Sequence, residues 1–305
     1  MIRVVENKLV SATGDTVVLR GVNHMFVWTD PAGRTVPEIA RTGANAVRIV
    51  WERSGSIRDL DRIVRSVLDH GMIPIPELHD GNTAGLEDWG WCMLDELVAW
   101  WVSDEVSKTL QPLQADMILN IANELGNAVS NESFADGYQR AVLRLRACGW
   151  TCPIMIDATE IGRNIRILRE VGPALLEQDP LRNLVFSIHT WWHRNDGWSE
   201  QKAIDEMSAT LDTGIPLVIG ECSDAGVYGN PLIDLRPLLA FAHERDVGYL
   251  VWSWGPGNKD NPLMDMTKDG RFDTLFGFGH EIATHPIYGL KTARRHGRPP
   301  PAGNS

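Results

Sequence analysis

The chain has 305 residues, with 43% hydrophobic and 23% charged side chains, a size and composition that suit one large globular domain such as an α/β barrel. Its formal net charge of −11 argues against a nucleic-acid partner, because such surfaces need clustered Lys and Arg. No apolar run reaches the roughly 18 residues needed to cross a membrane, and we expect no membrane partner.

The chain begins with a predicted β-hairpin and continues with strands that alternate with helices. In the hairpin, Ile2–Val5 pairs with Leu9–Val10 across a turn. Apolar runs of β character then predict eight strands. They are Val17–Asn23, Asn45–Val50, Met72–Leu78, Met117–Ala122, Ile154–Ala158, Leu184–His189, Leu217–Glu221 and Gly248–Trp254. We expect the third strand to be irregular, because Pro74 and Pro76 interrupt it.

Segments with apolar residues at helical spacing separate these strands. The clearest is Ile57–His70, in which apolar residues recur every three or four positions. The other predicted helices are Val36–Thr42, Met93–Gln111, Ser133–Cys148, Ile165–Gln178, Glu200–Thr213, Leu232–Arg245 and His280–Tyr288. Eight strands that alternate with eight helices are typical of a (β/α)8 barrel, an α/β fold.

The predicted barrel accounts for nearly the whole chain. We expect residues 1–292 to form a single (β/α)8 TIM barrel that starts with the short hairpin. No change in composition marks a second domain. Residues 293–305 contain three consecutive prolines and are predicted to be a disordered tail or a linker.

The four cysteines lack the spacing of a metal site. Cys148 and Cys152 lie four positions apart, so they form either a small disulfide or two buried thiols. We favour thiols, because large domains do not depend on disulfides. The start, Met1–Glu6, lacks the basic and apolar segments of a signal peptide. We therefore expect a cytosolic protein, or a secreted one whose signal peptide has been removed.

Polar and aromatic residues stand at the ends of the predicted strands, where a barrel of this kind has its active site. Two apolar strands end on a carboxylate, at Glu124 and at Glu221. A buried carboxylate is unfavourable unless it is paired or used in chemistry, so we expect these two to face each other in one site. The other strand ends carry Asn23, His24, Arg48, His79, Asp80, Asn123, Asp157, His189, Trp252, Ser253 and Trp254.

Six short motifs at these strand ends resemble glycoside hydrolase family 5 of clan A, and they are most similar to its bacterial β-mannanase branch. They are Gly21–His24, Thr42–Arg48, Glu77–Asp80, Ile121–Glu124, Phe186–His189 and Val218–Glu221. The motifs occur in the family's order, and the resemblance extends from about residue 8 to about residue 290. It implies a (β/α)8 barrel that cleaves β-1,4-linked mannan-type polysaccharides or oligosaccharides with retention of configuration.

The resemblance also implies a role for each group at the rim. Glu221 is expected to be the nucleophile, kept ionised by Arg48, and Glu124 the acid/base. Asn123 would hydrogen-bond the sugar 2-hydroxyl, and His79 and His189 would orient the carboxylates. The expected substrate-binding or supporting residues are His24, Trp28, Arg48, His79, Asn123, His189, Trp191, Trp252 and Trp254. We expect no metal and no cofactor, a β-linked glycan as the partner, and a monomer.

Twelve tryptophans are an unusual number, and most fall near the catalytic rim. The rim set is Trp28, Trp51, Trp89, Trp91, Trp191, Trp192, Trp198, Trp252 and Trp254. Flat aromatic faces suit the C–H faces of pyranose rings, and the family places a Trp at the position of Trp252, under the cleaved sugar. Trp100, Trp101 and Trp150 lie elsewhere and are expected to pack in the core.

Three positions depart from the family pattern. Trp191 stands where the family usually has a Tyr that hydrogen-bonds the nucleophile. Leu125 follows the acid/base where mannanases commonly have an aromatic residue or Pro, and Phe26 replaces a second His after the first strand. These departures bear on the sugar that is accepted more than on the type of reaction.

Alternative functions therefore stay open. The same mechanism could act on another β-glycan, such as a β-glucan or cellulose, or as an exo-acting β-mannosidase, since the loop Gly81–Gly90 could close one end of the cleft. A barrel that binds carbohydrate without cleaving it is an alternative of another class. A metal-dependent hydrolase built on His24, His79, Asp80 and His189 is disfavoured, because the first strand lacks the His-x-His pair of such enzymes.

Overall fold

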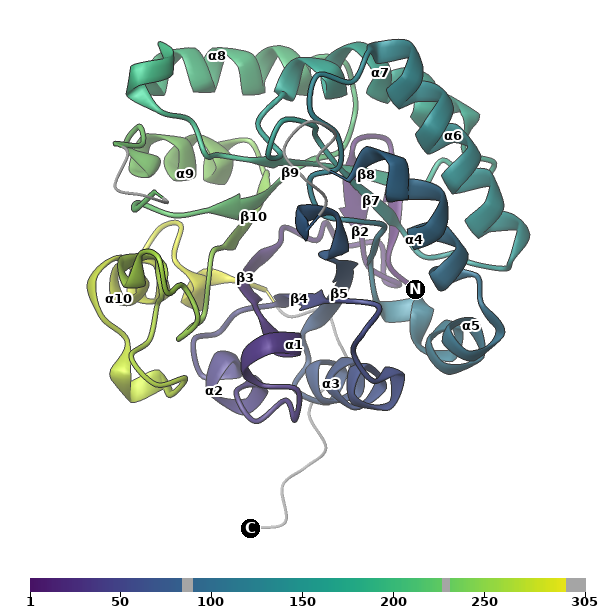
Figure 1. Ribbon diagram of the computed structural model, residues 1–305. Coiled ribbons are helices and arrows are strands. Elements are labelled where there is room, and N and C mark those ends of the chain that lie inside the picture. The colour runs from purple at the N-terminus through teal and green to yellow at the C-terminus, as the bar shows by residue number, and fades with distance from the viewer. Residues whose placement is uncertain (84–89, 227–230, 295–305) are drawn as a thin grey trace.

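Eight parallel strands form a closed barrel in this computed structural model, which describes residues 1–83, 90–226 and 231–294 (Figure 1). The strands follow one another around the barrel in chain order, and the last pairs with the first. They are β3 (Arg20–His24), β4 (Ala46–Trp51), β5 (Ile73–Leu78), β6 (Leu119–Asn120), β7 (Ile154–Asp157), β8 (Leu184–His189), β9 (Leu217–Cys222) and β10 (Gly248–Val251). The predicted (β/α)8 barrel is confirmed.

Helices connect successive strands and surround the barrel (Figure 1). They are α1 (Phe26–Thr29), α2 (Val36–Ala40), α3 (Ile57–Asp69), α4 (Leu94–Trp101), α5 (Asp104–Leu110), α6 (Asn131–Ala147), α7 (Ile165–Gln178), α8 (Glu200–Leu211), α9 (Leu235–Glu244) and α10 (Gly277–Thr284). In α3, Leu60, Ile63 and Val64 are buried, and each such side chain contributes about 1.5–3 kcal/mol to stability. The helices in the described parts of the chain are all too short or too polar to span a membrane.

The barrel interior has an apolar lower layer and a polar upper layer. Since side chains alternate along a strand, residues two positions apart share a face. The lower layer, near the N-terminal ends of the strands, contains Leu19, Ala46, Ile75, Ile118, Met155, Val185, Val218 and Leu250. Two positions further along four of these strands, the buried residues are Arg48, Glu77, Asn120 and Asp157. The fold thereby places a layer of polar groups directly on an apolar base.

The predicted hairpin is confirmed, and it covers the lower end of the barrel. Its strands β1 (Arg3–Val5) and β2 (Lys8–Val10) are antiparallel, with Val4 opposite Leu9. Ile2 and Leu9 belong to the same apolar cluster as the lower layer. The backbone N–H of Ile2 also donates a hydrogen bond to the carbonyl of Ala115 at 2.8 Å. The hairpin is therefore part of the barrel's core.

The prediction that β5 is irregular is wrong, because all six of its residues pair in register with β4. The carbonyl of Pro74 accepts a hydrogen bond from the N–H of Ile118, just before β6. The backbone groups of Pro74 and Pro76 therefore face β6 and not β4. Since β6 has only two residues, few ladder hydrogen bonds are lost there, and the prolines are tolerated.

The single helix predicted at Met93–Gln111 is also wrong, because the chain forms α4 and α5 with a break between them. Ser103 lies in the break in an extended conformation, with φ −62° and ψ 150°. Its Oγ donates a hydrogen bond to the carbonyl of Trp100 at 2.7 Å. Asp104 and Glu105 then occupy the first turn of α5. A Ser followed by acidic residues is a helix-start signal that the apolar periodicity concealed.

Two smaller predictions concern the cysteines and the segments outside the described residues. Cys148 and Cys152 do not form a disulfide; Cys152 is buried, whereas Cys148 is only half-buried. The prediction of free thiols is confirmed, whereas the predicted burial holds only for Cys152 of these two. The predicted tail beyond residue 294, and residues 84–89 of the predicted loop with Trp89, lie outside the described residues.

Candidate active site

Arg48 is the centre of the polar upper layer and is wholly buried. Its planar guanidinium donates five hydrogen bonds, which matches its five N–H donors. The acceptors are Asn120 Oδ1 at 2.8 Å, Glu221 Oε1 at 2.8 Å, Asn23 Oδ1 at 3.1 Å, Asn123 Oδ1 at 2.8 Å and Asp157 Oδ2 at 3.0 Å. Burial works against the charged form of Arg48, but the surrounding carboxylates raise its pKa above the ordinary value. The guanidinium therefore stays charged.

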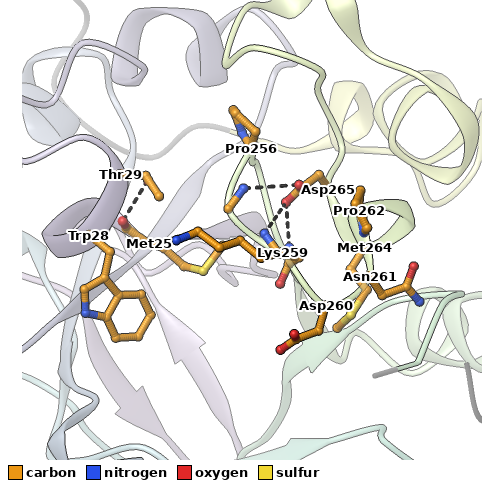
Figure 2. A pocket seen from close by; sticks show the side chains of 12 residues that line it. Met25, Trp28, Thr29, Pro256, Lys259, Asp260, Asn261, Pro262, Met264 and Asp265 are labelled. Atoms are coloured by element: carbon orange, nitrogen blue, oxygen red, sulfur yellow. Dashed lines mark hydrogen bonds between the residues drawn. The ribbon is translucent and has the colours of Figure 1, made fainter. Parts of the chain in front are cut away.

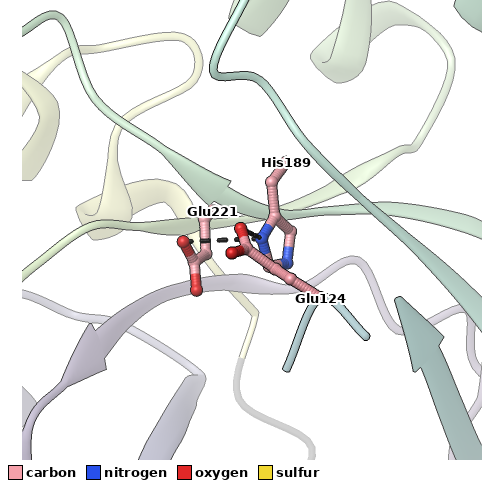
Figure 3. A group of neighbouring side chains, drawn as sticks. All are labelled: Glu124, His189 and Glu221. Atoms are coloured by element: carbon pink, nitrogen blue, oxygen red, sulfur yellow. Dashed lines mark hydrogen bonds and ion pairs between the residues drawn. The ribbon is translucent and has the colours of Figure 1, made fainter. Parts of the chain in front are cut away.

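Glu124, His189 and Glu221 meet beside Arg48 (Figure 3). One oxygen of each carboxylate and a ring nitrogen of His189 all lie within 4.8 Å of one another. His189 Nδ1 is 2.5 Å from Glu124 Oε1 and 3.4 Å from Glu221 Oε2. Each glutamate is only 3% exposed. The structure thus brings together the two carboxylates that the sequence places at separate strand ends.

A β-bulge in β9 turns Glu221 into the barrel. The register between β8 and β9 shifts at this point, which leaves Gly220 as an extra residue. A Cβ on Gly220 would lie 2.1 Å from Ser187 Oγ and 2.9 Å from His189 Nε2, so only glycine fits. Without the extra residue, the alternation of side chains would point Glu221 outward and Cys222 inward. Cys222 instead packs in the main core outside the barrel.

Glu124 owes its orientation to an unusual backbone conformation. Its φ of +50° lies in the left-handed region, which for a residue other than glycine costs about 1 kcal/mol. The N–H of Glu124 points at Asp157 Oδ2, 3.4 Å away, and its carboxylate meets His189. These two contacts offset the strain and direct the carboxylate toward Glu221.

The buried charges of the site shift each other's pKa values. Burial raises the pKa of Glu221 to about 7, and the nearby Glu124 adds to the rise, while His189 and Arg48 oppose it. Burial alone would lower the pKa of His189, but Glu221, Asp157 and Glu124 together raise it to about 9. A carboxyl group that titrates near neutrality beside a charged imidazole is typical of a catalytic site.

The family model of cellulase, glycosyl hydrolase family 5, matches residues 10–258. This chain belongs to glycoside hydrolase family 5. Among its relatives, the mannan endo-1,4-beta-mannosidase of Salipaludibacillus agaradhaerens is 29% identical over 292 residues, covering 93% of this chain and 91% of that protein. The mannan endo-1,4-beta-mannosidase of Streptomyces lividans is 29% identical over 288 residues, covering 92% and 73%. The mannohexaose complex of Thermomonospora fusca β-mannanase superposes with a TM-score of 0.86 at 27% identity, covering 97% and 98%.

In this family 5 glycosidase, both oxygens of Glu221 accept a hydrogen bond from a different donor. Arg48 Nη1 donates to Oε1 at 2.8 Å, and Trp191 Nε1 donates to Oε2 at 3.1 Å. Trp191 occupies the position where the family usually has Tyr, so an indole N–H supplies the donor here. Unlike a phenol, an indole N–H can neither ionise in the working range nor accept a hydrogen bond.

Trp252 and Trp28 both contact the ring of His79. The Trp252 ring stacks on His79 with 5.8 Å between centroids, and its N–H donates to Asn258 Oδ1 at 2.9 Å. Trp28 meets His79 edge-on at 5.3 Å and is 48% exposed. His79 Nδ1 in turn lies 2.8 Å from Glu77 Oε1. An accessible aromatic ring of this kind can pack against a sugar.

A pocket of about 680 Å³ adjoins Trp28 (Figure 2). It is formed by Met25, Trp28 and Thr29 after β3, and by residues 256–262, 264 and 265 after β10. In Figure 2, Trp28 lies across the pocket from Asn261 and Met264. Asn258 belongs both to the pocket and to the contact with Trp252. The pocket therefore continues from the surroundings of the Trp252 ring, with the mixed lining usual for ligand sites.

Two residues predicted to bind substrate or support the site, His24 and Trp254, do not line the cleft, so only the supporting role fits them. His24 follows the inward-facing Asn23 and so points outside the barrel, where it is 1% exposed and edge-on to Phe26 at 4.5 Å. Burial lowers its pKa to about 4. Trp254 is wholly buried, and its indole N–H donates to the carbonyl of Gly270 at 2.9 Å. Both residues support the fold and cannot touch a glycan.

The other described tryptophans of the predicted rim set also differ in how deeply they are buried. Trp51 and Trp192 are wholly buried, whereas Trp91 and Trp198 are half-buried. Trp198 stacks on Trp192 at 4.4 Å. Outside the rim set, Trp101 and Trp150 are wholly buried as expected, and Trp100 is half-buried and packs edge-on against Trp101 at 4.9 Å.

Sequence reasoning missed Asn120 and Glu77 as members of the site. Both are wholly buried, and Asn120 Oδ1 accepts the hydrogen bond from Arg48 Nε at 2.8 Å. Asp157 stood among the strand-end residues but was given no role. The signal that could have found all three is their spacing, because each follows an inward-facing apolar residue of the lower layer by two positions.

Within the described residues, Glu124, His189 and Glu221 form a group with the spacing of metal ligands. Their chemistry does not favour a cation. The raised pKa of His189 keeps its imidazole protonated at neutral pH, and a metal binds only the neutral ring. Arg48 already supplies the positive charge for Glu221. His24 and Asp80, which a metal site would also need, are not members of this group.

Proposed function

We propose that this chain is a retaining endo-β-1,4-mannanase that hydrolyses mannan-type polysaccharides. The observation that carries the mechanism is the separation of Glu124 and Glu221, whose oxygens lie within 4.8 Å. Retaining glycosidases have carboxyl groups about 5–5.5 Å apart, whereas inverting enzymes need about 6.5–9.5 Å. The substrate class rests on the similarity to two mannan endo-1,4-beta-mannosidases and to a β-mannanase that holds mannohexaose.

In the first step, an ionised Glu221 oxygen attacks the anomeric carbon and forms a glycosyl ester. The bond from that carbon to the glycosidic oxygen breaks, and Glu124 gives its proton to the departing oxygen. Arg48 and Trp191 favour the ionised nucleophile, since each donates a hydrogen bond to one of its oxygens. Burial and Glu124 oppose ionisation of Glu221. The carboxylate is therefore charged, but its charge is not stabilised so strongly that it loses reactivity toward the anomeric carbon.

In the second step, Glu124 takes a proton from water, and the water oxygen attacks the same anomeric carbon. The ester bond breaks and Glu221 recovers its negative charge, while Glu124 is again protonated. Two displacements at one carbon retain its configuration. The same carboxyl group serves first as acid and then as base, because it loses its proton in the first step and regains one in the second.

Asn123 is placed to recognise the sugar 2-hydroxyl. Its Oδ1 accepts a hydrogen bond from Arg48 Nη2 at 2.8 Å, so the amide orientation is fixed and its N–H groups point away from the guanidinium. A donor held in this way can strengthen its contact with the 2-hydroxyl as positive charge develops on the ring. The stacked Trp252 ring would lie under the same sugar, and the pocket beside Trp28 would take the continuing chain.

The test is a panel of mannan, glucomannan, cellulose and short mannooligosaccharides, with analysis of the products over time. We expect mannan cleavage to internal fragments, with the β-anomer formed first by NMR. Release of single mannose units would indicate an exo-acting mannosidase, and preference for cellulose would indicate a β-glucanase.

The Glu221→Ala variant separates a glycosidase from a barrel that only binds glycans. We expect turnover to fall by at least about 10⁴-fold, because no ester can form, with an unchanged circular dichroism spectrum. Unchanged turnover would refute the assigned nucleophile. Binding of mannohexaose to both proteins without any turnover would favour the binding function.

A further inference from the structure

Asp157 is wholly buried below the reacting pair and does not take part in either displacement. Its Oδ2 accepts a hydrogen bond from Arg48 Nη2 at 3.0 Å, and its Oδ1 accepts one from Asn120 Nδ2 at 3.2 Å. Two more contacts lead to the acid/base. Oδ2 lies 3.6 Å from His189 Nε2 and 3.4 Å from the backbone nitrogen of Glu124. Asp157 thus touches both supports of the Glu124 carboxylate.

The charges in the barrel do not balance around Arg48 alone. Glu77, Asp157 and Glu221 lie within 3.8, 3.0 and 2.8 Å of its guanidinium, and all are buried. An unpaired buried carboxylate costs several kcal/mol. Glu77 has His79 as a second partner at 2.8 Å. Asp157 and Glu124 need another positive charge, and the His189 ring lies where it would serve, between Asp157 on one nitrogen and Glu124 on the other.

We propose that Asp157 is a positioning residue for the acid/base: its carboxylate holds His189 as a doubly protonated ring whose Nδ1–H points at Glu124, and it holds the left-handed backbone of Glu124. The proposal rests on Glu124 being the acid/base. An imidazolium beside Glu124 stabilises the carboxylate that remains once the proton has gone to the leaving oxygen. It also orients this carboxylate for the attack of water in the second step.

Carboxylates and one glycine surround the His189 ring. The groups that face it are Glu124 from the loop after β6, Asp157 at the end of β7 and Glu221 in β9. Arg48, which shares two of these carboxylates, is bound to Asp157 and Glu221. Behind the ring, a Cβ on Gly162 would lie 2.4 Å from His189 Cγ. The raised pKa of His189 agrees with this carboxylate environment.

The first test compares leaving groups in the Asp157→Asn variant. An Asn keeps the size and the oxygen for Arg48 but removes the charge. With aryl β-mannobiosides, we expect kcat/KM for glycosylation to fall about tenfold for a poor leaving group such as 4-methylphenol. It should fall less than about threefold for 2,4-dinitrophenol, which departs without a proton. An equal loss with both substrates would overturn the proposal.

Two further variants make the result specific. In Glu124→Ala the same bias should be larger; its absence there would refute the proposed acid/base, whereas its absence in Asp157→Asn alone would refute only the role of Asp157. Glu77→Gln is the matched control, because Glu77 is also wholly buried and lies 3.8 Å from Arg48, but it pairs with His79. An equal leaving-group bias in Glu77→Gln would show a general charge effect and overturn the proposal.

A measurement on the unaltered enzyme serves if Asp157→Asn does not fold. Nitrogen-15 NMR of the imidazole rings, with the His189 signals assigned by loss in His189→Gln, reports both ring nitrogens directly. We expect both to carry a proton at pH 7 and to titrate together near pH 9. A neutral single tautomer of His189 at pH 7 would overturn the proposal.

Discussion

At the scale of single residues, the reactivity of Glu221 depends on the two hydrogen-bond donors that contact its carboxylate oxygens. Arg48 and Trp191 each hold one oxygen of Glu221, and only Arg48 brings charge. The indole N–H adds direction, because it fixes the plane of the carboxylate without adding a proton that could be lost. Trp191 is therefore a replacement for the family's Tyr with a different pH behaviour.

The Trp191→Phe variant should lose this donor while keeping an aromatic ring. A hydrogen bond to a charged group is worth about 1.5–3 kcal/mol, so we expect kcat/KM to fall about tenfold or more. Since the ionised form of Glu221 loses a donor, its pKa should rise above about 7, and the acid limb of the kcat/KM profile should move to higher pH.

The control is Trp252→Phe, which also removes an indole N–H, but one that donates to Asn258. Its acid limb should stay in place even if the rate falls. A shift of equal size in both variants would contradict the assigned role of Trp191. The pH profiles of kcat/KM on one soluble mannooligosaccharide are the measurement.

The sequence predicts the reacting residues better than their supports. Glu124 and Glu221 could be found because an apolar strand that ends on a carboxylate is visible in one dimension. Asp157 and Asn120 could not be ranked, because their importance comes from meeting Arg48 across the barrel, and spacing along the chain does not show that. His24 was misplaced although the alternation of side chains, with Asn23 facing inward, could have excluded it.

At the scale of elements, the bulge in β9 is the device that aims the nucleophile. One extra residue reverses the direction of Glu221, and the room for it is made by the absent side chain of Gly220. Bulges are frequent beside active sites for this reason. Strand periodicity alone predicts β9 but not the bulge, because an inserted residue leaves no mark on an apolar run.

The Gly220→Ala variant should disturb this element directly. The new Cβ would lie 2.1 Å from Ser187 Oγ, and overpacking of this kind costs about 1–3 kcal/mol. We expect a lower unfolding midpoint and a loss of kcat of about 100-fold, because a displacement of about 1 Å at the nucleophile has that effect.

Ser187 provides the matched comparison, because its buried Oγ has no hydrogen-bond partner in the described structure. Adding Ser187→Ala to Gly220→Ala removes the nearest clash and should restore part of the stability and of the activity. A double variant no more stable than Gly220→Ala would contradict the steric explanation. Thermal unfolding and initial rates on mannan measure the two effects.

Element boundaries were predictable where local signals agreed. The helix α3 begins at Ile57, directly after its N-cap Ser56, and has four buried apolar residues on one face, so sequence and structure coincide closely. The break at Ser103 and the regular β5 were mispredicted for opposite reasons. At Ser103, the apolar pattern that continues through the segment concealed the signal for the start of a new helix. In β5, the prolines face β6, which has only two residues, so they interrupt few hydrogen bonds.

At the scale of the whole molecule, the shifted groups make stability depend on pH. The pKa values of Glu221, about 7, and of His189, about 9, both lie above their ordinary values of 4.5 and 6.5. The folded protein therefore binds these protons more tightly than the unfolded chain does. Each contribution is present at low pH and is lost on raising the pH, from 4.5 to 7 for Glu221 and from 6.5 to 9 for His189.

We therefore expect the unfolding midpoint of the Glu221→Gln variant, relative to the unaltered protein, to rise between pH 5 and pH 7. The Glu221 contribution is a few kcal/mol at most, which corresponds to roughly 5 °C for a chain of this size. Differential scanning calorimetry at pH 5, 6 and 7 measures it. Parallel curves for the two proteins would show that Glu221 titrates at an ordinary pH.

The covered lower end of the barrel has a kinetic consequence. In the described part of the chain, the apolar layer and the hairpin residues Ile2 and Leu9 close the lower end, so solvent reaches Glu124 from the upper end. The departing oligosaccharide, the incoming water and any competing sugar acceptor use this upper end. Water, which releases a free sugar, and a second glycan, which accepts the glycosyl group, therefore compete for the same approach to the anomeric carbon.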